Sequence, residues 1–220
     1  MTKRVSFDGV EVELAEPAGS ARAPALVLVQ EWWGVNGHIR DLVTRFAAQG
    51  FLVAAPDLYH GEVATDAEDA GRRMTALDTL VAVKEIGKAA DFLKAHPRSN
   101  GKVGVTGFCL GGALSLAAAC HVPGLSAVVA FYGIPPAAKV DYAKVTAPVM
   151  AHFAKRDDWA TAGKAEAIKR ELAARGVPMD LHVYDADHAF VNDTRPEVYD
   201  ERNAKLALER TYAFLREKLA

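Results

Sequence analysis

The sequence predicts a protein of the α/β class, with a mostly parallel sheet, helices on both faces and an antiparallel hairpin at the N-terminus. Unbroken apolar segments such as 25–29 and 51–55 are typical of parallel strands buried on both faces. Helical segments separate these strands, as parallel connections require. Before them, apolar and polar residues alternate on either side of Asp8-Gly9, a strong signal for a two-residue hairpin turn.

The elements follow in a regular order along the chain. The hairpin pairs residues 5–7 with 10–14, and a connection rich in Pro, Ala and Gly leads to the first buried strand. The expected buried strands are 25–29, 51–55, 102–106, 126–132, 147–153 and 180–184. The expected helical segments are 37–49, a long region over 66–95, then 110–121, 160–174 and 200–219.

The length and net charge of the chain limit the number of domains and the kinds of partner that it can have. The 220 residues are half apolar and carry no internal repeat or linker, which predicts one domain over residues 1–220. A net charge of −2 provides neither a basic field for nucleic acid nor a polybasic patch for a membrane surface. The expected partner is therefore a small molecule, and the chain is expected to be a monomer or weak homodimer.

Cysteine usage and the N-terminus indicate the compartment. The two cysteines, Cys109 and Cys120, lie within one strand and helix unit, so neither a disulfide framework nor a CxxC zinc site is indicated. Residues 1–9 turn polar before an apolar signal region can develop, and no run of 18 apolar residues follows. We expect a cytoplasmic protein without metal or cofactor.

The segment Gly107-Phe108-Cys109-Leu110-Gly111 has the pattern of a nucleophile elbow, with sulfur as the nucleophile. A strand enters this turn and a helix leaves it, so the central residue is strained and its neighbours must be small. The amide of Leu110 would then face a developing oxyanion. The alternative, a buried inert thiol, suits Cys120 better, because Cys120 follows three alanines on the helix.

Polar residues gather where the expected strands end, which is where an open α/β sheet places its working groups. His188 follows the last strand and is the candidate base. Asp157, Asp158 and Asp187 are candidate orienting acids. Because neighbours in sequence rarely point at each other's rings, the 157/158 loop is preferred over Asp187, and Asp157 is chosen within it. An N-cap or turn role for Asp157 is the alternative. Among the other six histidines, only His60 stands where it could line a pocket.

Glu31 directly follows an apolar run and precedes Trp32-Trp33, so its carboxylate is expected to be partly desolvated and to need a partner. It could take the thiol proton or bind a polar substrate group, and a salt bridge to an arginine is the structural alternative. The amide of Trp32 is the expected second oxyanion donor.

These motifs, together with Ala55-Pro56-Asp57-Leu58-Tyr59, Phe131-Tyr132-Gly133 and Asp187-His188-Ala189-Phe190, closely resemble the dienelactone hydrolase (carboxymethylenebutenolidase) family over nearly the whole chain. The resemblance implies an α/β-hydrolase fold and a triad of Cys109, His188 and Asp157. It also implies that Glu31 activates the thiol and that Tyr132 belongs to the pocket, which we expect Trp33 and Tyr59 to shape as well.

The resemblance further implies two arginines that hold a substrate carboxylate, one of them four residues past the histidine, where this chain has Asn192. Arg195 is a candidate replacement, and Arg72 or Arg73 could supply the other. The expected activity is hydrolysis of a small ester or lactone through a Cys109 acyl-thioester. The alternatives are a general carboxylesterase of the same fold and a non-catalytic redox-sensing thiol protein.

Overall fold

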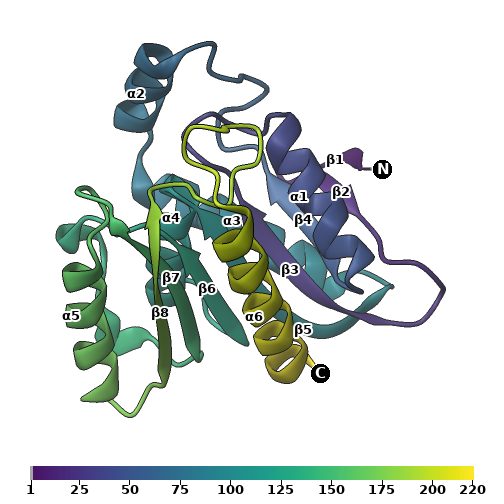
Figure 1. Cartoon of the computed structure of the whole chain (residues 1–220). Coiled ribbons are helices and arrows are strands. Elements are labelled where there is room, and N and C mark those ends of the chain that lie inside the picture. The colour runs from purple at the N-terminus through teal and green to yellow at the C-terminus, as the bar shows by residue number, and fades with distance from the viewer. Residues whose placement is uncertain (1) are drawn as a thin grey trace.

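The computed structural model describes residues 2–220, which form one eight-stranded sheet flanked by helices (Figure 1). The strands lie in the order β1-β2-β4-β3-β5-β6-β7-β8. Their bounds are β1 Lys3–Phe7, β2 Val10–Ala15, β3 Ala23–Val29, β4 Leu52–Pro56, β5 Ser99–Phe108, β6 Ala127–Phe131, β7 Val149–Arg156 and β8 Met179–Asp187. The strands from β3 to β8 pair in parallel, whereas β1 and β2 run antiparallel to their neighbours. This arrangement confirms the predicted fold class.

The helices cover both faces of the sheet, as predicted. They are α1 Gly37–Ala48, α2 Ala67–Ala76, α3 Thr79–Ala95, α4 Leu110–His121, α5 Ala162–Ala173 and α6 Glu201–Leu219, with 3₁₀ turns at Ala137–Lys139 and Tyr142–Lys144. Helices α1 and α6 pack on one face, and α3, α4 and α5 pack on the other. In β3, Val27 and Val29 face one core while Leu26 and Leu28 face the opposite one, which explains the unbroken apolar run.

The hairpin and most boundaries agree with the sequence prediction. Phe7 pairs with Val10, so Asp8 and Gly9 form the two-residue turn, both with positive φ. The region 66–95 differs because it contains two helices. Leu77 is extended, and the Asp78 side chain accepts from the amides of Leu80 and Val81 to start α3.

Helix α2 stands apart from the sheet and from the other helices, at the top of the view in Figure 1. The long loop after β8 reaches the same end of the molecule. Within residues 2–220 no helix is both long and apolar enough to cross a membrane. The expectation of a single domain stays a prediction.

Candidate active site

Cys109 occupies a strained turn between β5 and α4. Its φ of 55° and ψ of −115° lie outside the regions that non-glycine residues ordinarily adopt. The amide of Cys109 donates to the Phe131 carbonyl, and its carbonyl accepts from Ala113. These bonds hold the turn, so the side chain leaves the end of the sheet at a fixed place.

Two glycines make this turn possible through close backbone approach. A Cβ at Gly107 would lie 2.3 Å from the carbonyl oxygen of Gly111, and a Cβ at Gly111 would lie 2.3 Å from that of Val29. Both distances are far below van der Waals contact, and backbone atoms cannot move aside cheaply. The small residues that the elbow pattern requires are therefore needed for packing.

Cys109 is 7% exposed as a residue and lines a cavity. Burial raises the pKa of the thiol well above its usual range, and the nearby Glu31 carboxylate raises it further. The amides of Leu110 and Trp32 face the sulfur and act in the opposite direction. Burial thus favours the protonated thiol, which lies beside two convergent N–H donors.

Asp157 orients the imidazole of His188. Nδ1 of His188 lies 2.6 Å from Oδ2 of Asp157, and the other carboxylate oxygen accepts from the amides of Trp159 and Ala160 at 2.9 and 2.8 Å. Asp157 is buried, which would raise its pKa, but the bond from His188 and these amides hold the pKa below its ordinary value. The imidazole therefore has a fixed carboxylate partner.

Glu31 is buried beside the thiol. Its Oε2 accepts from Nδ2 of Asn192 at 2.7 Å, while Oε1 has no hydrogen-bond partner among the described residues. Burial raises the pKa of Glu31 to about 7, although Asn192, His188 and Arg195 each lower it. The partner is thus a neutral amide, not the arginine salt bridge considered as an alternative.

Asn192 is itself held in one orientation. Its Oδ1 accepts from the backbone amide and the hydroxyl of Thr194, so its NH₂ group must point toward Glu31. The sequence marks Asn192 only as a position where the family has arginine. Its bond to Glu31 joins residues 161 positions apart and has no local signal.

The side chains of Glu31, Cys109, Asp157 and His188 line one cavity of about 420 Å³, a size suited to a small ligand. Its walls are Glu31, Trp32, Trp33, Met74, Cys109, Arg156, Asp157, Asp158, Trp159, His188, Ala189 and Arg195. Sequence reasoning missed Met74 and Trp159 and did not assign Arg156 to the pocket. A larger groove of about 660 Å³ along α1 and α6 contains none of the predicted site residues.

Tyr59 and Tyr132, which the sequence assigns to the pocket, are not among the residues that line this cavity. The Tyr132 ring is fully buried and packs edge-on against His188, with centroids 5.1 Å apart. Tyr59 is 8% exposed, and burial, followed by the nearby Cys109, raises its pKa to about 12. Tyr132 therefore packs against the imidazole, while Tyr59 is buried near Cys109.

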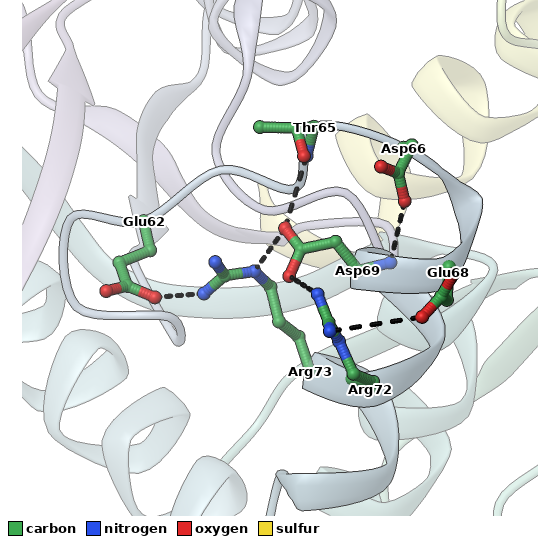
Figure 2. Close-up of polar contacts among 7 residues, drawn as sticks. All are labelled: Glu62, Thr65, Asp66, Glu68, Asp69, Arg72 and Arg73. Carbon is green, nitrogen blue, oxygen red and sulfur yellow. Dashed lines mark hydrogen bonds and ion pairs between the residues drawn. The ribbon is translucent and has the colours of Figure 1, made fainter.

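Of the three candidate substrate-binding arginines, Arg195 lines the cavity and the other two do not. Arg195 lines the cavity, stacks over the Trp33 ring at 5.9 Å and donates from Nε to Glu197. Arg72 and Arg73 lie on α2 and pair with Asp69; Arg72 also pairs with Glu68, and Arg73 with Glu62 (Figure 2). Neither lines the cavity.

The remaining candidates have other partners. Nε2 of His60, whose side chain is 65% exposed, lies 3.7 Å from Oε1 of Glu85, and His60 is absent from the cavity wall. Asp187 pairs with Arg156 and not with His188. Cys120 is buried, and its thiol donates to the Leu116 carbonyl. Among residues 2–220 there is no group of three or more His, Cys, Asp or Glu side chains that could hold a metal ion.

The sheet order, the elbow and the histidine after the last strand define an α/β-hydrolase. The chain belongs to the Dienelactone hydrolase family, whose sequence model matches residues 10–219. It is accordingly a hydrolase of that family.

Relatives match over almost the whole length. The chain is 38% identical to Protein usf of Aquifex pyrophilus, with 100% of each chain covered. It is 30% identical to Carboxymethylenebutenolidase 1 of Cupriavidus pinatubonensis, covering 94% of this chain and 96% of that protein. The crystal structure of a protein described as a "Putative Dienelactone Hydrolase" from Klebsiella pneumoniae superposes on this chain with a TM-score of 0.88 at 26% identity, covering 98% of each chain.

Proposed function

We propose that this protein hydrolyses a small ester or lactone through an acyl-thioester on Cys109. One observation carries the proposal: the Cys109 thiol, the Asp157–His188 pair and the buried Glu31 carboxylate converge on one cavity. A redox sensor needs an accessible thiolate of low pKa, whereas burial raises the pKa of this thiol. The arrangement favours catalysis over sensing.

Acylation begins with transfer of the thiol proton to Glu31. The resulting thiolate attacks the substrate carbonyl carbon, and the bond from that carbon to the leaving oxygen then breaks. His188 relays the proton from Glu31 to the departing oxygen, so the thiol hydrogen ends on the released alcohol. The substrate carbonyl oxygen, negative in the tetrahedral intermediate, is bound by the amides of Leu110 and Trp32.

Deacylation uses the same imidazole as a base. With Nδ1 hydrogen-bonded to Asp157, Nε2 of His188 takes a proton from water as the water attacks the thioester carbon. The carbon–sulfur bond breaks, and the proton returns to sulfur. The cycle releases a carboxylic acid and restores the thiol, with no cofactor in any step.

The cavity favours substrates that do not carry a carboxylate next to Glu31. Asn192 provides a neutral donor where the family has an arginine, and Arg195 is the candidate cation at the rim. Trp33 provides an apolar wall, while Tyr132 packs against the imidazole and Tyr59 is buried near Cys109. Sulfur is a soft nucleophile, so activated esters, enol-lactones and thioesters suit it better than amides.

The test is a panel of esters, enol-lactones and matched amides on the native protein and on Cys109→Ala. We expect turnover of activated esters and a loss of at least about 1,000-fold in Cys109→Ala. Cys120→Ala is the matched control, because its thiol is buried away from the cavity. Equal ester turnover in the native protein and Cys109→Ala, or faster turnover of an amide than of its matched enol ester, would refute the proposal.

A further inference from the structure

A second cavity of about 580 Å³ adjoins the catalytic one, and we call it the annex. Its walls are Met74, Leu77, Thr79, Leu110, Ala113, Leu114, Ile134, Pro135, Pro136, Ala137, Trp159 and Lys164. Met74 and Trp159 line both cavities, so the two cavities adjoin at these side chains. An arm that passes between Met74 and Trp159 would reach the annex from the catalytic cavity.

The annex is apolar in character. Most of its walls are aliphatic or aromatic, and Leu77, Leu110 and Ile134 are only half-buried. Of its lining residues only Lys164 is charged, and the Lys164 ammonium donates to the Trp159 carbonyl at 3.1 Å. When an apolar group covers half-exposed apolar side chains on a concave surface, the burial of apolar area makes the free energy of binding more favourable.

The annex lies beside the reacting groups. Leu110 gives its amide to the sulfur and its side chain to the annex wall. Trp159 packs edge-on against the His188 ring with centroids 5.4 Å apart. Since His188 must deliver a proton to the leaving atom, the leaving group lies on the His188 side of the carbonyl carbon. The leaving group therefore lies beside Trp159, and the Trp159 side chain also forms part of the annex wall.

Polar contacts hold the wall that α2 contributes (Figure 2). Asp69 accepts from the Thr65 amide and from Arg73, which also pairs with Glu62. The Ala64 amide donates to the Trp33 carbonyl at 2.9 Å, which ties this loop to the segment that carries Trp32. The loop comes so close that a Cβ at Gly34 would lie 2.8 Å from the Glu62 carbonyl oxygen. Met74 and Leu77 are thus fixed relative to the catalytic cavity.

We propose that the annex binds an unbranched apolar arm on the leaving-group side of the substrate, so that the enzyme prefers esters or thioesters of longer alkyl alcohols or thiols. The proposal rests on the proposed function and adds its substrate class. Acyl chains point away from His188, and lengthening them gains no contact with the annex.

The experiment compares two series that differ only in which side grows. One series is S-methyl to S-hexyl thioacetate, and the other is the S-methyl thioesters of acetic to heptanoic acid. Full burial of a methylene is worth about 0.8 kcal/mol, or roughly fourfold, so half-burial predicts about a twofold gain in kcat/KM per methylene. We expect the S-hexyl compound to exceed the S-methyl compound by about 30-fold in native protein, with a flat acyl series.

Ala137→Trp fills the mouth of the annex from an exposed position, and Ala138→Trp is the matched control on the same 3₁₀ turn, outside the annex wall. Ala137→Trp should reduce the hexyl-to-methyl ratio to within about threefold of one, and Ala138→Trp should keep the native ratio. Leu77→Ser removes apolar wall at the end of α2 and should also lower the ratio. The proposal would be overturned if the hexyl-to-methyl ratio in all three variants equalled that of native protein. It would also be overturned if kcat/KM rose along the acyl series instead.

Binding to Cys109→Ala separates this proposal from the hydrolase proposal. Equilibrium dialysis of S-hexyl and S-methyl thioacetate against Cys109→Ala should show tighter binding of the hexyl compound, and adding Ala137→Trp should remove the difference. If native protein turns over no thioester but this difference is present, the annex stands and the hydrolase proposal fails. If both compounds bind equally, the annex proposal fails whatever the turnover.

Discussion

Asn192 donates a hydrogen bond of 2.7 Å from Nδ2 to Oε2 of Glu31, and both residues are buried in the described structure. A neutral donor stabilises a carboxylate less than a cation would. Burial consequently dominates and raises the pKa of Glu31 to about 7. This carboxyl therefore exchanges its proton near neutral pH, where a general base is most useful.

Glu31→Gln should slow acylation and remove a pH dependence. The basic form of Glu31 predominates above its pKa of about 7, so the acylation rate of the native protein should rise with pH through about 7. Glu31→Gln lacks the acceptor, and its acylation should be at least about 100-fold slower and lack this step. Single-turnover kinetics with an activated ester measure both. Glu85→Gln is the control, because Glu85 lies near His60 outside the cavity.

The same burial makes a prediction for stability. The folded-state pKa of Glu31 is raised above the unfolded value, so the favourable contribution is complete below about pH 4.5 and is lost as the pH rises through about 7. Glu31→Gln removes this loss. Relative to native protein, the variant should gain about 3 kcal/mol in free energy of unfolding between about pH 4 and about pH 8. Urea unfolding of both proteins at the two pH values measures the gain, and parallel pH curves would contradict it.

Two aspartates near the histidine provide a matched pair. Asp157→Asn removes the carboxylate that accepts from His188, and kcat should fall by about 1,000-fold or more because the imidazole loses its orientation and charge partner. Asp187→Asn affects only the pairing with Arg156 and should change kcat less than about fivefold. Steady-state kinetics on both variants decide the assignment. A larger loss in Asp187→Asn would make that residue the orienting acid.

Gly111→Ala should destabilise the fold. Its Cβ would lie 2.3 Å from the Val29 carbonyl oxygen, so the elbow or β3 must shift. We expect a loss of about 3 kcal/mol or more in free energy of unfolding. Gly163→Ala, in α5 with no atom within 4 Å of its Cβ, is the control and should be neutral or stabilising by up to about 1 kcal/mol. Thermal unfolding of both variants tests the difference.

The features that local patterns determine could be predicted from the sequence. The elbow around Cys109 is such a pattern, and the position of His188 after the last strand follows from strand order in an α/β sheet. The meeting of Glu31 with Asn192 could not be predicted, because it depends on side chains from distant loops. The position of α2 was equally hidden, because polar contacts to its own loop hold it, and no buried apolar stripe reports where it packs.

The most direct test of the central claim is peptide mass spectrometry of protein quenched during turnover of an activated acetate ester. His188→Ala retains the thiol and Glu31 but lacks the base that activates water. The leaving group of an activated ester departs without the proton that His188 relays, so acylation continues and the acyl-enzyme should accumulate. We predict a stable acetyl group on Cys109 and none on Cys120, which is buried in α4. Ester turnover by native protein with the acetyl group absent from Cys109 in both proteins, or carried by another residue, would contradict it.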